Sequence, residues 1–142
     1  MNEKQEGGWL CSVVYVGRVE PARSPEAQQD AYRARLRALI DATVSAVRND
    51  DRFTVETRDG VALCFLSDPE DALTAAVALR ERVRAERPTD LLRVRIGVHL
   101  GMVRVPKDPA GRLPPVGDGL DTARHVMSLA EPDQILASRP FF

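Results

Sequence analysis

The stretch Phe53-Thr-Val-Glu-Thr-Arg-Asp-Gly-Val-Ala-Leu-Cys-Phe65 predicts a β-hairpin. Two runs rich in apolar and β-branched residues flank the pair Asp59-Gly60, and an Asp-Gly pair between such runs is the strongest short-range hairpin signal. Asp59 has two interpretations. It is a turn residue that serves the backbone geometry of the hairpin, or it is one of two carboxylates that together hold a metal ion.

The segments on either side of the hairpin predict a regular order of elements. A buried strand is expected over 9–17, followed by a helix that begins at Ser24-Pro25 and ends near Asn49. After the hairpin, Asp68-Pro69 begins a second helix, and residues 92–98 alternate as a half-buried strand does. The order strand, helix, strand, strand, helix, strand is that of the ferredoxin-like split βαβ fold.

Each of the two helices has an apolar stripe at helical spacing, which predicts the face that it buries. In the first helix the stripe comprises Tyr32, Leu36, Leu39, Ile40, Thr43, Val44 and Val47. In the second helix it comprises Leu73, Ala76, Val77, Leu79 and Val83.

Beyond this core the sequence predicts a tight turn at His99-Leu100-Gly101 and an added strand over 102–105. A loop rich in proline and glycine follows over 106–115, before a third helix over 120–130 and a short strand over 134–137. The fold class is therefore α/β, an α+β sandwich with a ferredoxin-like βαββαβ core and an added strand, helix and strand. Residues 1–8 are expected to be disordered, and 9–142 to form one domain.

Composition excludes several kinds of partner. The net charge of −1 gives no electrostatic footprint for nucleic acid or for an anionic membrane. The longest apolar run, 61–66, is far too short to span a bilayer, and the polar N-terminus lacks the apolar segment of a signal peptide. Cys11 and Cys64 lie in apolar, strand-like runs, which predicts buried thiols and a reducing, cytoplasmic location.

Three segments, 59–65, 92–101 and 128–138, together resemble the catalytic domain of class III adenylate/guanylate cyclases, in the family's order and over most of the chain. The resemblance implies a class III nucleotide cyclase-like fold and a head-to-tail dimer with its active sites at the interface. It also implies two divalent cations, Mg²⁺ or Mn²⁺, held by two aspartates. An arginine, an asparagine and a pair of base-reading residues complete the family's site.

When the family's site positions are carried over one by one, this chain has few of these groups on its strands. The first metal-binding aspartate falls at Tyr15 to Gly17, where this chain has no carboxylate. The second matches Asp59, the single family-equivalent metal position that survives, but Arg58 replaces the usual glycine before it. The base-reading positions fall on Val55 and Pro114.

On the third helix, the family's catalytic asparagine falls on Asp121 and its transition-state arginine on His125. Arg124 is one residue out of register, a rotation of about 100° on a helix. The residues alone suggest other roles: Asp118 and Asp121 compensate the dipole at a helix start, and His99 is a hydrogen-bonding residue. Asp118, Asp121 and His125 also form a loose candidate metal cluster.

These substitutions predict a degenerate cyclase homology domain, without activity or cofactor, that acts as a dimerising or regulatory module in intracellular signalling. Its expected partner is a second copy or another cyclase-like domain, and fused signalling domains are possible. One alternative is an active or heterodimer-dependent cyclase that makes a cyclic nucleotide from ATP or GTP with Mg²⁺ or Mn²⁺. Another is a nucleotide-sensing module that does not cleave its ligand.

The end of the sequence adds an expectation about assembly. The chain ends at 139–142, just after its last predicted strand, where family members continue with two more strands. The predicted sheet therefore has an open edge with two exposed phenylalanines, Phe141 and Phe142, which favours pairing with another chain.

Overall fold

A computed structural model of the chain describes residues 8–19, 26–45, 51–57, 60–66, 68–86, 93–104 and 115–141. Within these ranges it contains one five-stranded sheet and three α-helices. In chain order the elements are β1 (Gly8–Val19), α1 (Glu26–Val44), β2 (Arg52–Thr57), β3 (Gly60–Phe65), α2 (Pro69–Ala85), β4 (Arg93–Arg104), α3 (Asp118–Ser128) and β5 (Ile135–Ala137).

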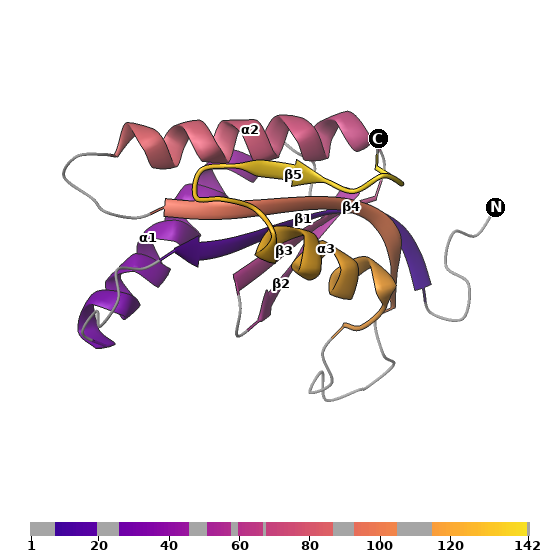
Figure 1. Ribbon diagram of the computed structural model, residues 1–142, viewed down its shortest axis with the longest axis horizontal. Helices are drawn as coiled ribbons and strands as arrows, with labels where there is room; N and C mark the ends of the chain where they lie inside the picture. Colours follow the sequence, from indigo (N-terminus) through magenta and orange to yellow (C-terminus); the bar gives the residue numbers. More distant parts are fainter. Residues whose placement is uncertain are drawn as a thin grey trace.

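The sheet has the strand order β2-β3-β1-β4-β5 (Figure 1). The first four strands pair antiparallel, and β5 joins β4 in parallel. The order and direction of these four strands, with α1 and α2 between them, confirm the ferredoxin-like core. The added helix and final strand are confirmed as α3 and β5.

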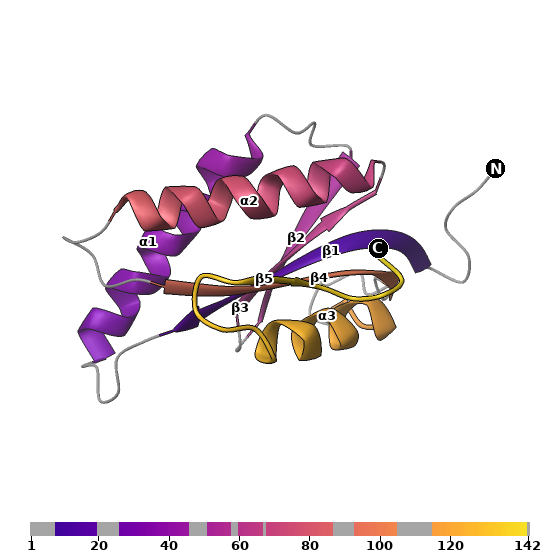
Figure 2. The same cartoon turned by 45° about the horizontal axis from the view of Figure 1, so that its top comes forward.

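Two layers of helix enclose the sheet. Figure 2 shows α1 and α2 on one face and α3 on the other. Strand β1 supplies both cores, because successive side chains of a strand point to opposite faces. Val14 and Val16 pack in the core beneath α1 and α2, whereas Val13 and Tyr15 belong to the core beneath α3.

The predicted turn at His99-Leu100-Gly101 is wrong, and so is the separate added strand after it. β4 continues without a break to Arg104, because β1 pairs with it over its whole length, from Gly8↔Arg104 to Val19↔Arg93. The glycines of β4 serve close packing instead of a turn. A Cβ on Gly97 would lie 2.7 Å from the carbonyl oxygen of Ala123, and one on Gly101 would lie 2.9 Å from the Cα of Gly119.

Helix α3 therefore packs with its backbone directly on β4. The two glycines are four strand residues apart, about 13 Å at 3.3 Å per residue. Gly119 and Met127, which face Gly101 and Gly97, are eight helical residues apart, about 12 Å at 1.5 Å per residue. The matching lengths allow the helix to contact both glycines, and they fix its position along the strand.

The predicted apolar stripe of α2 is displaced around the helix. Leu73 and Val77 are 45% and 38% exposed, so these two predictions of burial are wrong. The buried face comprises Ala72, Ala75, Ala76, Leu79 and Val83. Three alanines at the start of this face let α2 approach the sheet closely, so small residues are buried there and larger ones lie outside.

Most of the α1 stripe is confirmed, since Tyr32, Leu36, Ile40 and Val44 are buried. The predicted helix start at Ser24-Pro25 and the stripe residue Val47 lie outside the described residues. At the start of α2, Asp68 acts as predicted: its carboxylate accepts a hydrogen bond of 2.9 Å from the backbone N–H of Glu70.

Two further predictions concern the core. Cys11 and Cys64 are confirmed as free, buried thiols. The prediction that Phe141 is exposed is wrong, because this side chain is partly buried and packs on the core beneath α1 and α2. Phe142 lies outside the described residues. None of the described helices has both the length and the apolar character needed to cross a bilayer.

Candidate functional site

The C-terminal end of β1 lies against the closed end of the β2–β3 hairpin, where β2 ends and β3 begins. Val16 pairs with Val61, and a Cβ on Gly60 would collide with the carbonyl oxygen of Val16. On the hairpin, Thr57 pairs with Gly60, and its Oγ1 accepts a hydrogen bond of 3.1 Å from the Gly60 N–H. Positions 58 and 59, and with them the predicted metal residue Asp59, lie outside the described residues.

The positions that match the first metal aspartate carry no carboxylate and are already packed. Tyr15 is 2% exposed and its hydroxyl is hydrogen-bonded to Thr57 Oγ1, while Val16 and Gly17 are buried. The next residue, Arg18, brings a positive charge instead of a negative one. The described residues at this end of the sheet therefore do not fit a pair of divalent cations, which needs carboxylate ligands here.

The position of the base-reading lysine is also part of the core. Val55 is 6% exposed and packs in the core beneath α3. Pro114, which matches the acidic base-reading residue, lies outside the described residues.

Asp121 and His125 lie four residues apart on α3 and are both exposed, as is Arg124. Spacing of four places Asp121 and His125 on one face of the helix. The last turn of α3 lies over Gly97, and Gly97 pairs with Tyr15. The end of α3 that carries His125 is therefore at the same end of the sheet as the hairpin and Tyr15.

Asp118 lies at the opposite end of α3 and has partners of its own. Its carboxylate accepts a hydrogen bond of 2.9 Å from Thr122 and lies 3.5 Å from Nε2 of His99. His99 is buried, and its Nδ1 lies 2.7 Å from the hydroxyl of Ser138. Through Nδ1, His99 thus joins β4 to the segment after β5, the hydrogen-bonding role expected for it, while Nε2 makes no hydrogen bond with the described residues.

In the part of the chain that the structure describes, no three His, Cys, Asp or Glu side chains come together as a metal site would require. Asp118, Asp121 and His125 are therefore not brought together as the loose metal cluster considered above.

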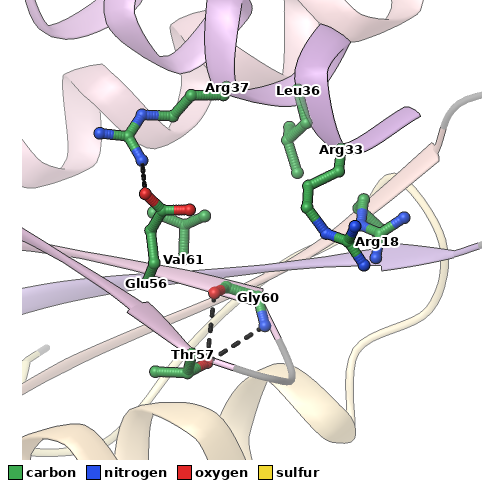
Figure 3. A pocket seen from close by; sticks show the side chains of 8 residues that line it. All are labelled: Arg18, Arg33, Leu36, Arg37, Glu56, Thr57, Gly60 and Val61. Carbon is green, nitrogen blue, oxygen red and sulfur yellow. Dashed lines mark hydrogen bonds and ion pairs between the residues drawn. The ribbon is translucent and has the colours of Figure 1, made fainter. Parts of the chain in front are cut away.

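Sequence reasoning missed a pocket between α1 and the hairpin. Its lining comprises Arg18, Arg33, Leu36, Arg37, Glu56, Thr57, Gly60 and Val61 (Figure 3). Arg37 forms ion pairs with Glu56 and, at 3.3 Å, with Asp41. Burial by itself lowers the pKa of Arg37, but its hydrogen bonds and charge interactions with these two carboxylates outweigh burial and raise that pKa.

The signal for this pocket was weak in the sequence. Arg33 and Arg37 are spaced by four residues on α1, a pattern that ordinary solvent-exposed helices also have. Only the folded chain places the end of β1, with Arg18, beside Arg33.

Solved structures supply the comparison with known proteins. The monomeric guanylyl cyclase domain of a rhodopsin fusion protein from Blastocladiella emersonii superposes with a TM-score of 0.76 at 20% identity, over 94% of this chain and 84% of that one. A non-canonical dimeric form of the same domain superposes with a TM-score of 0.73 at 21% identity, over 94% of this chain and 82% of that one. An adenylate/guanylate cyclase/hydrolase from Silicibacter pomeroyi superposes with a TM-score of 0.71 at 22% identity, over 94% of this chain and 78% of that one. The chain has the fold of a class III nucleotide cyclase catalytic domain.

The resemblance seen in the sequence is thus confirmed at the level of the cyclase fold. No known protein-family profile matches the sequence, and no curated protein is similar to it. Within the cyclase fold, the end of β1, the hairpin and the outer face of α3 are the places that the sequence comparison assigns to the catalytic groups. In this chain the first of them is filled by Tyr15, Val16 and Gly17.

Proposed function

We propose that this chain is a catalytically inactive cyclase homology domain that acts as a dimerising, regulatory module. The observation that carries the proposal is the contrast between its fold and its chemistry. The cyclase fold extends over 94% of the chain, while the end of β1 offers Tyr15, Val16 and Gly17 in place of a metal-binding carboxylate.

Physical reasoning supports the loss of turnover. Cyclisation displaces pyrophosphate from a triphosphate, and its transition state depends on concentrated positive charge to stabilise the phosphates. Loss of one such electrostatic group costs roughly 10²–10³ in rate. Here the first carboxylate position, the lysine position at Val55 and the arginine position at His125 have all changed. Such losses together remove detectable catalysis.

Support for a dimerising role is of a different kind. The same guanylyl cyclase domain is described as a non-canonical dimer in one of the similar structures and as monomeric in another, so the fold is compatible with both states. In our proposal the protein contributes its surface to an assembly, and the exposed face of α3 with Asp121 and His125 is available for contact with a second chain.

The purified chain is incubated with ATP or with GTP, each with Mg²⁺ and with Mn²⁺, and cyclic nucleotide is measured by mass spectrometry. We expect no product above a control without protein, with an active cyclase domain as the positive control. Turnover that disappears in Asp59→Ala would contradict the proposal. Asp51→Ala is the matched control, because it removes a carboxylate from the opposite end of the same hairpin.

Repeating the assay after mixing with a complementary cyclase domain tests the heterodimer-dependent alternative. Our proposal predicts that the mixture has only the activity of the added domain. A further increase that Asp59→Ala abolishes would establish a heterodimeric enzyme instead. Calorimetry with ATP or GTP tests the nucleotide-sensing alternative, which a titration without heat of binding would exclude.

A further inference from the structure

The two cysteines of the chain are neighbours in the core beneath α3. Cys64 of β3 pairs with Val13 of β1, and Cys11 comes two residues before Val13, on the same face of that strand. Cys11 and Cys64 are therefore diagonal neighbours across two hydrogen-bonded strands. Both side chains are 0% exposed, and both thiols are free.

The two thiols interact, and the interaction makes them unequal. The S–H group of Cys11 donates to the carbonyl oxygen of Trp9 at 3.6 Å, which leaves the Cys11 sulfur to accept a hydrogen bond from Cys64. That hydrogen bond lowers the pKa of Cys11, although burial acts in the opposite direction. For Cys64 the hydrogen bond and burial both raise the pKa. Cys11 is therefore the thiol that ionises first, while Cys64 keeps its proton.

Such a pair has the parts of a redox-active dithiol. The thiolate is the nucleophile in cysteine oxidation, so the thiol that ionises first reacts first. A second thiol beside it converts the first oxidation product into a disulfide. The geometry gives the first role to Cys11 and the second to Cys64.

The pair lies near the end of the β1–β3 ladder. The last pair of this ladder is Ser12↔Phe65, so Cys11 lies one residue beyond it. Among the described strands, only β4 pairs with this end of β1. Trp9 and Leu66, both half-buried, pack against the cluster that contains the thiols. Local opening of a strand end costs less than global unfolding, so movement here exposes Cys11 while the rest of the sheet stays folded.

We propose that Cys11 and Cys64 are a reversible redox couple, which a hydroperoxide oxidises to a disulfide between β1 and β3. The Cys11 thiolate attacks one peroxide oxygen and becomes a sulfenic acid, and the other oxygen leaves as hydroxide, which takes up the Cys11 proton to form water. The Cys64 sulfur then attacks the Cys11 sulfur, and the sulfenic hydroxyl leaves with the Cys64 proton as a second water. The two sulfurs lose two electrons, and the peroxide gains them.

Disulfide formation must move the end of β1 towards β3. Diagonal neighbours have Cα atoms about 7–8 Å apart, whereas those of bridged cysteines are usually about 4.4–6.8 Å apart. Cys11 can make this movement because it lies beyond the last β1–β3 pair. A disulfide that holds the strand end away from its relaxed position is readily reduced by a dithiol, which makes the couple reversible. It goes beyond the proposed function, since it requires neither cyclase turnover nor its absence.

The test treats the reduced full chain with hydrogen peroxide in native buffer. The chain has only two cysteines, so an intramolecular disulfide can join no other pair. Intact mass spectrometry should show the loss of two hydrogen atoms, and the product, once denatured, should have no thiol that reacts with a maleimide. Dithiothreitol should restore both readings. Emission from Trp9, the single tryptophan, should change in step with the disulfide.

Single-cysteine variants separate the two roles. Cys64→Ala keeps the nucleophile and removes the thiol that resolves it, so a sulfenic acid at Cys11 should accumulate and be trapped by dimedone. Cys11→Ala is the matched variant, and its remaining thiol should be trapped roughly tenfold more slowly or less, because it keeps its proton. Equal trapping in the two variants would contradict the assigned roles.

A further variant asks whether the folded protein is the species that reacts. Ala76→Leu overpacks a fully buried position of α2 on the other face of the sheet, which lowers global stability without touching the thiols. We expect disulfide formation at the rate of the unmodified chain, as local opening of β1 requires. A rate that rises with the population of unfolded chains would mean that only unfolded protein is oxidised, and would overturn the proposal.

Two results with the unmodified chain would also overturn it: both thiols still free after peroxide treatment, or disulfides only between separate chains. Neither depends on whether a variant folds. Cyclic nucleotide production is a separate measurement, so the redox couple and the proposed inactivity can fail independently.

Discussion

At the scale of single residues, Gly97 determines how closely α3 approaches the sheet. A Cβ at this position would lie 2.7 Å from the carbonyl oxygen of Ala123 and closer still to the backbone nitrogen of Met127. Both are backbone atoms of α3, which cannot move aside as the end of a flexible side chain can. Even one methyl group must therefore displace α3 as a whole.

Gly97→Ala should lower the free energy of unfolding by about 1–3 kcal/mol, the usual cost of overpacking a closely packed interior. Urea unfolding followed by circular dichroism measures this as a lower midpoint with an unchanged slope. Met102→Ala, at a 42% exposed position on the same strand, is the control and should change stability by about 0.5 kcal/mol or less. A Gly97→Ala protein as stable as this control would contradict the packing described for α3.

Residue-level prediction from the sequence succeeded where local geometry determines the outcome. The hairpin was expected over 53–65, and β2 and β3 occupy Arg52–Thr57 and Gly60–Phe65. Gly101 was misassigned to a turn, because a glycine required for close approach of two backbones looks the same in sequence as one required for chain reversal. The pairing partner that distinguishes the two, Cys11 on β1, is ninety residues away in sequence.

At the scale of elements, α2 shows how size and burial can be mistaken for each other. The sequence pattern favoured burial of Leu73 and Val77, the larger side chains, but the helix buries Ala72, Ala75 and Ala76. Two overlapping apolar faces, rotated around the helix relative to each other, are possible when alanines and larger apolar residues are mixed along a helix. The distance between helix and sheet decides between them, and that distance is a property of the folded protein.

Two substitutions in α2 compare these faces directly. Ala76→Leu adds atoms at a position with 0% exposure and should destabilise the protein by about 1–3 kcal/mol. Leu73→Ala removes a similar number of atoms from a 45% exposed position, and the change should stay within about 0.5 kcal/mol. Urea midpoints of the two proteins provide the measurement. The reverse ranking would mean that the helix presents its other face to the sheet.

At the scale of the whole molecule, the order of strands and helices follows from the sequence, whereas the contents of the site do not. The spacing of apolar residues along the chain switches between that of a strand and that of a helix, and this predicts the βαββαβ order. The resemblance to the cyclase family rests on three separate segments. The arginine pocket could not be read in this way, because Arg18 and Arg33 come from different elements and meet only after α1 packs on the sheet. The predicted roles of Asp59, Asp121 and His125 stay predictions.

Assembly is also a property at this scale, and we expect the chain to form dimers. The predicted contribution of Phe141 to an exposed edge is withdrawn, since this residue packs on the core. The expectation rests instead on the proposed dimerising role, and a similar guanylyl cyclase domain is described as a non-canonical dimer in one structure and as monomeric in another. Sedimentation velocity over a range of protein concentrations should show a monomer–dimer equilibrium. A single monomeric species at the highest concentration would count against the dimerising role.

The antiparallel ladder between β1 and β4 has a consequence for how the chain reaches its fold. It joins Gly8 to Arg104 and Val19 to Arg93, so between about half and two thirds of the sequence separates the partners at the centre of the sheet. Contacts between such distant residues slow folding, because a long loop must close before they contribute stability. During synthesis β1 is made before α1 and α2, and β4 only after both of them. Until then, one edge of β1, the central strand of the sheet, lacks its native partner, and aggregation competes with folding.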